Sequence, residues 1–443
     1  MVFSRFFKPR NAGDASADAA AEPAEAEADT SAPDADGEAP EELYDKTWSE
    51  RAAAVFPTGA STGSKRPEAL YGPGDDFGPT HFASAAGCHV VMPDGSTLVD
   101  CTMELGAVAI GYAEPNITRA VVDAASNGNV AGLSHTLEVE LAERFCDTVP
   151  CAEKVQFLKT GAEAVAAAVR LARTYTGRDH VIGSGYFGWL DWSSSSAGVP
   201  RGVSQDFTSV PFDDIAALEN AAASAGNRLA AVVLEPVVER MASPAWIAAA
   251  RAVCDKAGAA LIFDEMKTGF RLATGGYQEY ANVTPDLAAF GKALANGYPL
   301  SAVCGKADLM DAARKTWISS TLACESIAFA AANTVIEIHR SAEVCSELWR
   351  IGAEMRKVVG DALTASGLKG VAIDGIDPMW LLRFESPALE GHFLRTAAAQ
   401  GALFKRGAYN FASLAHDDDA LRDIEASASN AFVEVRDALE AEE

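Results

Sequence analysis

The sequence predicts an α/β protein, with a large domain built on a mainly parallel sheet and a smaller α+β domain after it. Between about residues 155 and 306, short apolar segments alternate with helical patterns, which is typical of strand–helix–strand units. After about residue 320 the pattern changes to long helices and a few strands. The chain has 443 residues, of which 49% are apolar, which is enough for two or three packed units.

The segments of the predicted large domain are short and clearly delimited. A hairpin is expected first, at 89–101, with Asp94-Gly95 at its turn. The expected strands that follow are 155–158, 181–185, 229–237, 259–265 and 299–306. The helices between them are expected at 162–177, ended by Gly177, and at 243–258, capped by Ser243 and ended by Gly258. Because 229–237 is almost wholly apolar, this strand should be buried on both faces.

The last part of the chain predicts a different architecture. We expect helical structure over 325–366, strands at 371–376 and 379–386, a helix at 388–400, a short strand near 402–405 and a final helix from 417. The predicted organisation is therefore a tail (1–43), an entry segment that contributes to the small domain (44–95), a large domain (96–325) and a small C-terminal domain (326–443).

The composition narrows the class of function. Residues 11–42 hold eleven acidic residues and no basic one, which predicts a disordered tail. The net charge of −26 argues against binding to nucleic acid or an anionic membrane, and no apolar run reaches the roughly 18 residues of a membrane span. The eight cysteines form no Cys-x-x-Cys pair and no cluster with histidines, so we expect no metal and a cytoplasmic protein with reduced thiols.

Two residues at predicted strand ends carry the chemistry. Asp264 closes one apolar strand, and Lys292 follows the apolar run 287–291. Taken singly, a helix cap and an exposed lysine are the commoner roles for these residue types. Together they match what pyridoxal 5'-phosphate (PLP) requires, because a lysine amine holds this cofactor as a Schiff base and a carboxylate pairs with its ring nitrogen.

Two further segments lie where a sheet of this kind binds ligands, beyond the strand ends. Thr160-Gly161-Ala162 joins a strand to a helix, and backbone N–H groups at a helix start favour an anion such as phosphate. Tyr186-Phe187-Gly188-Trp189 follows another strand, and an aromatic side chain there can stack on a ring or simply pack in the core. The chain has no dinucleotide-binding or Walker pattern, so nucleotide binding is not supported.

In order along the chain, these motifs resemble the class III aminotransferases, PLP enzymes of fold type I, and within them the branch of glutamate-1-semialdehyde 2,1-aminomutase. The resemblance covers about residues 50–440. It is most specific in 263–271 (FDEMKTGFR), 157–179 and 290–300.

The resemblance implies a role for each matching residue. Lys292 would be the Schiff-base lysine and Asp264 the partner of the ring nitrogen. The implied remaining cofactor contacts are Thr160, Gly161, Ala162, Tyr186, Phe187, Glu235 and Met266, with Thr321 reaching the phosphate of a neighbouring subunit. The site would then be shared across a homodimer.

The departures from the aminomutase bear on the reaction. Glu104-Leu105-Gly106 replaces its Ser-Trp-Gly, Ala408 stands about where it has an acidic residue, and the segment from Tyr186 to 197–200 is shorter. In the aminomutase that segment is a lid that retains an intermediate. A short lid favours plain transamination between an amino donor and a carbonyl acceptor. The low-specificity candidates for substrate contacts are Lys65, Arg66, Glu104, Trp189 and Arg406.

Three alternatives stay open at this point. The first is the aminomutase reaction itself, an intramolecular amine transfer on one substrate. The second is another PLP reaction, a racemisation or a decarboxylation, which the same lysine and aspartate can serve. The third is a non-enzymatic scaffold that has kept the fold, which the intact Lys292, Asp264 and phosphate turn disfavour.

Overall fold

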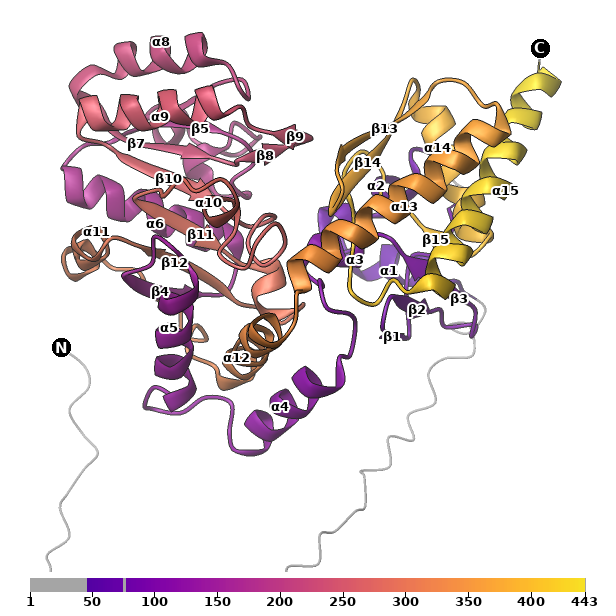
Figure 1. Cartoon of the computed structure of the whole chain (residues 1–443), viewed down its shortest axis with the longest axis horizontal. Coiled ribbons are helices and arrows are strands. Elements are labelled where there is room, and N and C mark those ends of the chain that lie inside the picture. The colour runs from indigo at the N-terminus through magenta and orange to yellow at the C-terminus, as the bar shows by residue number, and fades with distance from the viewer. Residues whose placement is uncertain (1–45, 75–76, 443) are drawn as a thin grey trace, which may run out of the picture. The chain divides into compact units, whose positions relative to one another are not determined.

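The computed structural model describes residues 46–74 and 77–442, and Trp48–Glu443 forms one compact unit. Its centre is a seven-stranded sheet in the order β4-β12-β11-β10-β7-β5-β6 (Figure 1). These strands are β4 (Lys154–Leu158), β5 (His180–Ser184), β6 (Phe207–Ser209), β7 (Leu229–Leu234), β10 (Ala260–Asp264), β11 (Leu287–Phe290) and β12 (Ser301–Gly305).

The sheet is parallel except for one strand. β11, β10, β7, β5 and β6 pair in parallel, whereas β12 runs antiparallel to both of its neighbours, β11 and β4. β4 therefore runs in the same direction as the other five strands. The carboxyl ends of these six strands lie at the same edge of the sheet as the start of β12. The predicted mainly parallel sheet is confirmed.

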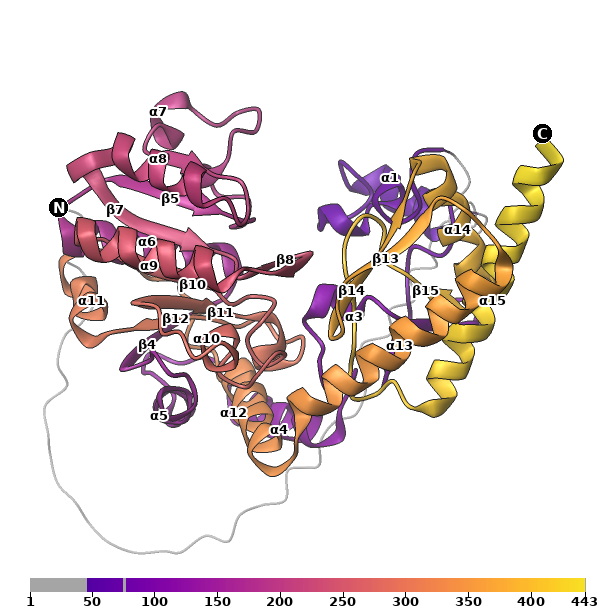
Figure 2. The ribbon, with the colours of Figure 1, turned by 45° about the horizontal axis from the view of Figure 1, so that its top comes forward.

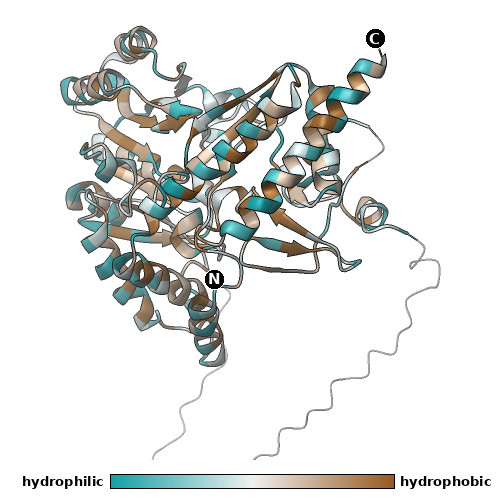
Figure 3. Ribbon diagram, turned by 45° about the vertical axis from the view of Figure 1, so that its right-hand side comes forward, coloured by the Kyte–Doolittle hydropathy of each residue, from teal (hydrophilic) through white to brown (hydrophobic). Residues whose placement is uncertain are grey.

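Helices cover both faces of this sheet because its strands are apolar on both sides. On β10, Ala260 and Ile262 belong to the core cluster under α6 (Gly161–Thr176), whereas Leu261 and Phe263 belong to the cluster on the other face. The second face is covered by α5 (Thr136–Thr148), α8 (Ile215–Ala225), α9 (Pro244–Ala257) and α12 (Ser326–Ser341). In Figure 3 the strands are largely brown, and the helices carry both brown and teal residues, as two-sided burial requires.

The C-terminal part has its own strands and helices. α13 (Val344–Ser366), α14 (Pro387–Ala399) and α15 (Asp418–Glu442) lie side by side in Figures 1 and 2, next to a three-stranded antiparallel sheet, β13-β14-β16. Its strands are β13 (Val371–Ile376), β14 (Met379–Phe384) and β16 (Asn410–Phe411). A four-stranded sheet joins the first strands of the unit to a late one. It comprises β1 (Ser84–Ala86), β2 (His89–Val91), β3 (Thr97–Asp100) and β15 (Ala402–Leu403).

The remaining elements are short or lie at the edges. They are α1 (Trp48–Val55), η2 (Gly63–Lys65), α2 (Pro67–Tyr71), α3 (Met103–Gly106), α4 (Pro115–Ser126), η3 (Asp191–Ser193), α7 (Arg201–Ser204), η4 (Gly226–Arg228), β8 (Val237–Val238), β9 (Arg240–Met241), α10 (Tyr277–Tyr280), η5 (Lys292–Ala295), α11 (Ala307–Met310) and η6 (Asp311–Lys315). No helix in the described part of the chain is long and apolar enough to cross a membrane.

Most expected elements are present, with two corrections. The helical stretch 325–366 is two helices, α12 and α13, because the chain is extended at Ala342. The strand expected over 229–237 ends at Leu234, where Glu235 leaves the sheet. Helices α4, α5 and α8, strands β1, β6 and β16 and several short helices were not predicted. The predicted disordered tail (1–43) lies outside the described residues, and the domain boundaries after residues 95 and 325 stay predictions.

Two glycines of α13 give a test of how this helix packs. A Cβ at Gly352 would lie 1.8 Å from the carbonyl oxygen of Asp377, whereas a Cβ at Gly360 would meet Ile373 at an ordinary 3.6 Å. We expect Gly352→Ala to lower the free energy of unfolding by about 3 kcal/mol or more, because backbone cannot yield as a side chain can. Gly360→Ala, the matched control, should raise it by about 0.5–1 kcal/mol. Urea unfolding of both variants measures this, and equal effects would contradict the packing described.

Candidate active site

Four neighbouring parallel strands each deliver one candidate residue to the same edge of the sheet. Tyr186 follows β5, Glu235 follows β7, Asp264 ends β10 and Lys292 follows β11. The register pairs the ends of β5 and β7, of β7 and β10, and of β10 and β11. Ligands of open α/β sheets bind outside the carboxyl ends of the strands, so this edge is the candidate active site.

Asp264 is a buried carboxylate that lacks a cationic partner. The residue is only 4% exposed. It accepts one hydrogen bond, from the Met266 N–H at 2.9 Å, and forms no ion pair with the described residues. Burial and the nearby Glu235 raise its pKa to about 8, although the Met266 N–H, Lys267 and Lys292 oppose the rise. A ligand with a positive charge at this point would remove the cost of burying the carboxylate.

Lys292 stands in a left-handed backbone conformation, with φ of 49°, directly after Gly291. Burial and the charge of Lys267 lower its pKa to about 8, against the opposing charges of Asp264 and Glu235. About a tenth of its amine is therefore unprotonated at pH 7, far more than for an ordinary lysine, and only an unprotonated amine is a nucleophile.

A second lysine, Lys267, lies at the same edge, and no motif in the sequence predicted a role for it. Its Nζ is 2.8 Å from Glu235 Oε1. The other carboxylate oxygen of Glu235 accepts the N–H of Tyr186 at 2.9 Å. Burial lowers the pKa of Lys267, but Glu235, Tyr409 and Asp264 raise it more, so the net pKa lies above the ordinary value. The only sequence signal was the position of this lysine, three residues beyond a buried aspartate.

The expected phosphate turn is the start of α6. Thr160 is its N-cap and shares three hydrogen bonds with Glu163. The threonine hydroxyl accepts the Glu163 N–H, and the glutamate carboxylate accepts both the Thr160 N–H and the Thr160 hydroxyl. The N–H groups of Gly161 and Ala162 donate to no described residue, so they are the donors left for an anion. A Cβ at Gly161 would lie 2.7 Å from Met266 Sδ, so a larger residue here would displace the Met266 side chain from the start of α6.

The aromatic residues after β5 divide between surface and core. Tyr186 is 71% exposed and Trp189 77% exposed. Phe187 is buried and packs on Trp192, with ring centroids 5.8 Å apart, and on Phe207. The structure therefore places Tyr186 and Trp189 where a ligand can reach them and Phe187 in the core beneath.

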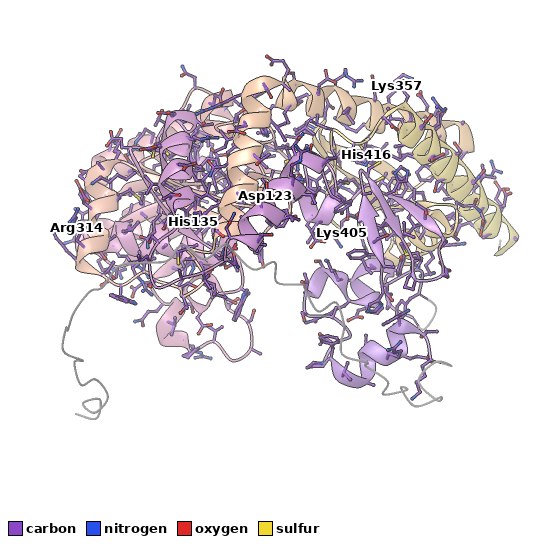
Figure 4. All side chains as sticks on the ribbon, turned by 90° about the horizontal axis from the view of Figure 1, so that it is seen from below. Asp123, His135, Arg314, Lys357, Lys405 and His416 are labelled. Carbon is purple, nitrogen blue, oxygen red and sulfur yellow. The ribbon has the colours of Figure 1, made fainter. Side chains whose placement is uncertain are left out.

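The candidate substrate residues are scattered, and most are already paired. Lys65 forms an ion pair with Glu104 at 2.7 Å, and Arg406 lies 3.3 Å from Glu390. Arg66 caps α2 and is half-buried. Lys405, beside Arg406 and labelled in Figure 4, donates to a backbone carbonyl. Thr321 does not contact this edge within the described residues. It is exposed in the turn before α12, and its hydroxyl forms no hydrogen bond with a described residue.

Glu104 sits in a strained turn tied to the site. Met103, Glu104 and Leu105 have φ of 42°, 50° and 57°, a left-handed path that non-glycine residues rarely adopt. Asp100 accepts the Met103 N–H, and the fully buried Arg271 donates to the carbonyl of Gly106 at 2.9 Å. Because Arg271 belongs to the turn after β10, this turn is fixed relative to Asp264.

The described residues hold no group of three or more histidines, cysteines or carboxylates that could bind a metal ion. They do fit PLP. The unpaired Asp264 carboxylate suits a protonated ring nitrogen, the Lys292 amine suits an aldehyde, and the start of α6 suits a phosphate. Together, the fold and this edge define a PLP-dependent enzyme of fold type I.

Comparison with known proteins identifies the family. Residues 74–406 match the model of the class III aminotransferases, and the chain belongs to this family. It is 35% identical over 307 residues to glutamate-1-semialdehyde 2,1-aminomutase of Myxococcus xanthus, covering 63% of this chain and 69% of that protein. It is 34% identical over 357 residues to 2'-deamino-2'-hydroxyneamine transaminase of Streptomyces kanamyceticus, covering 80% and 88%. The PLP-bound FumI protein of Sphingopyxis sp. MTA144 superimposes with a TM-score of 0.84 at 25% identity, covering 89% and 97%.

The protein is thus a PLP-dependent class III aminotransferase or aminomutase, which confirms the predicted fold, cofactor and enzyme class.

The environment of Asp264 predicts a pH dependence of stability in the cofactor-free protein. The folded-state pKa, about 8, exceeds the ordinary 3.8, so the stabilisation is present at low pH and is lost as the pH rises through about 8. Asp264→Asn removes this titration. As the pH rises from 5 to 8, the free energy of unfolding should fall in both proteins, and it should fall by on the order of 2–4 kcal/mol less in the variant than in the wild type.

The measurement is urea unfolding at several pH values, with Asp311→Asn as the control. Asp311 is a carboxylate in an ion pair with Lys154 that is largely exposed on both sides. Its removal should leave the slope in this range unchanged. Parallel curves for the wild type and Asp264→Asn would contradict the buried, unpaired state of this carboxylate.

Proposed function

We propose that the protein transfers an amino group from an amino donor to a separate carbonyl acceptor, and that Lys292 moves the proton in both half-reactions. The observation that carries this proposal is the set of four adjacent strand ends that places Lys292, Asp264, Glu235 and Tyr186 at one edge. When bound, PLP supplies an electron sink that stabilises negative charge on the substrate carbon.

The residues divide the work by their charge. Lys292 is the covalent attachment point, because its lowered pKa makes the unprotonated amine accessible, whereas Lys267 is held as a cation by Glu235. Released by the donor, the Lys292 amine would take a proton from the donor carbon and deliver it to the cofactor carbon, and it would carry out the same transfer in the opposite direction on the acceptor. Asp264 keeps the ring nitrogen protonated, and the N–H groups of Gly161 and Ala162 bind the phosphate.

Transfer between two substrates is favoured over the intramolecular reaction by the segment after β5. Only the short helix η3 stands between Tyr186 and residue 200, and both Tyr186 and Trp189 are largely exposed. A short, open segment lets a product leave after the first half-reaction. The aminomutase reaction is the second candidate, and the likeness to the enzyme of Myxococcus xanthus favours it.

The acceptor in this proposal is a polar, polyhydroxylated carbonyl compound. The likeness to the neamine transaminase of Streptomyces kanamyceticus spans 88% of that protein. The Lys65–Glu104 pair offers both a donor and an acceptor of hydrogen bonds, as hydroxyl groups require, and its side chains are 45% and 40% exposed. We also place the enzyme in the cytoplasm, where its eight free cysteines would stay reduced.

The enzyme is further proposed to be a homodimer in which each subunit completes the other's site. Large apolar side chains are exposed on two neighbouring segments: Val130, Leu133, Trp317 and Leu322. The segments are joined where Ser326 and Ile327 donate to Asn129. Thr321 lies between Trp317 and Ser326, so a second copy covering this surface would bring Thr321 against the partner's phosphate site.

The transamination is tested by absorption spectra of the PLP-loaded protein. An amino donor alone should move the visible cofactor band to shorter wavelength, and a carbonyl acceptor should restore it, because each half-reaction runs separately. Lys292→Ala should lack the wild-type band and lose at least about 1,000-fold in activity. Turnover of a single amino-aldehyde, with no band shift by any separate donor, would instead establish the aminomutase.

Mixing two inactive variants tests the shared site. Thr321→Asp places a carboxylate against the proposed phosphate and should abolish activity through the partner's site. After joint refolding with Lys292→Ala, activity should recover to roughly a quarter of wild type, because half of randomly paired dimers are hybrids with one intact site. A mixture of Lys292→Ala with Asp264→Asn is the control. Both residues belong to the same sheet edge of one subunit, so each site of a hybrid dimer carries one substitution and no activity should return. No recovery in the first mixture would exclude Thr321 from the partner's site.

A further inference from the structure

Lys267 makes contacts that the reaction described above does not use. Besides the Glu235 carboxylate, its ammonium faces the ring of Tyr409, at 4.7 Å from the ring centroid. Tyr409 in turn accepts the N–H of Glu239 through its hydroxyl at 2.7 Å. The cation is therefore held between the turn after β10, the end of β7 and the C-terminal part of the unit, with a side chain that is 14% exposed.

Glu235 is fixed just as closely from its other side. Its Oε2 accepts the Tyr186 N–H, and a Cβ at Gly185 would lie 2.6 Å from Glu235 Cγ. Gly185 also has φ of +134°, so glycine is needed there both for space and for conformation. Lys267, Glu235 and the Tyr186 N–H thus form one chain of contacts along the ends of β10, β7 and β5.

The charges around Lys292 explain why a second cation matters. Two carboxylates, Asp264 and Glu235, attract a proton to Lys292, and two cations, Lys267 and Arg271, repel it. Arg271 donates only to backbone carbonyls and is fully buried, so it cannot respond to the site. Lys267 is bound directly to one of the two carboxylates and so cancels much of its charge.

We propose that Lys267 is a positioning residue, a permanent cation that clamps Glu235 against the Tyr186 N–H and disfavours a second positive charge at Lys292. The inference rests on the proposed role of Lys292 as the attachment point. Removing the charge at residue 267 then leaves Glu235 free to stabilise the protonated amine of Lys292. Lys267 acts on the reaction only through these two neighbours.

The test measures the protonation of Lys292 in the full-length, cofactor-free protein. Trace acetylation with acetic anhydride at a series of pH values, followed by peptide mass spectrometry, gives a titration midpoint for each lysine. In Lys267→Met the Lys292 midpoint should rise by about one pH unit, so that acetylation near pH 7.5 slows roughly tenfold. Lys267→Arg should keep the wild-type midpoint, because it keeps the charge.

Controls separate this effect from loss of structure. Lys267→Gln, which can still donate to Glu235, carries the same test if Lys267→Met does not fold, and thermal unfolding checks each variant. Lys306→Met removes a lysine from the ion pair with Asp286 at the other end of β11 and should leave the Lys292 midpoint unchanged.

Either of two results would overturn the proposal. One is an unchanged Lys292 midpoint in folded Lys267→Met or Lys267→Gln. The other is a wild-type Lys267 that is acetylated as readily as Lys292, since a clamped cation should be protected. Failure of the proposed function is distinguishable, because it would show as an unaltered cofactor band in Lys292→Ala whatever the acetylation result.

Discussion

The structure depends on keeping a carboxylate, Asp264, buried at the end of a central strand. Burial without a cation is unfavourable and raises the pKa of this carboxyl to about 8, and a positively charged group of a bound ligand would offset that cost. The neighbouring groups follow from this constraint. Lys292 cannot be a full cation and remain a nucleophile, and Glu235 would add a second unpaired charge without Lys267. The edge of the sheet is thus a set of opposed charges whose balance is completed by the cofactor.

The sequence alone was sufficient for most strands of the sheet, but it missed β6 and placed the end of β7 at residue 237 instead of Leu234. The local signals that were confirmed are the apolar runs of the strands, the N-cap Ser243 and the glycines that follow α6 and α9. The break between α12 and α13 was missed because both halves are strongly helical and only an extended residue separates them. β16 was missed because its two residues are in a strand only through their pairing with β14.

For the site, the sequence pointed to the residues but not to their partners. Asp264 and Lys292 were predicted because Asp264 ends an apolar run and Lys292 follows one, which is a local pattern. The pairing of Lys267 with Glu235 joins residues 32 positions apart in sequence, and no local pattern encodes it. The same holds for Arg406 and Lys65, whose ion pairs with Glu390 and Glu104 depend on how distant segments meet.

The left-handed turn at Met103–Gly106 has an evolutionary consequence. The turn is held by Asp100, whose carboxylate accepts backbone N–H groups, and by Arg271, which donates to a backbone carbonyl. The side chains of Glu104 and Leu105 take no part in those bonds, so they can be exchanged while the loop keeps its path. In a protein built in this way the side chains at the tip of this loop can change while the backbone of the loop, held by Arg271, stays in place. The left-handed backbone conformation of Met103, Glu104 and Leu105 is energetically unfavourable, and the turn keeps this conformation when the side chains at its tip change.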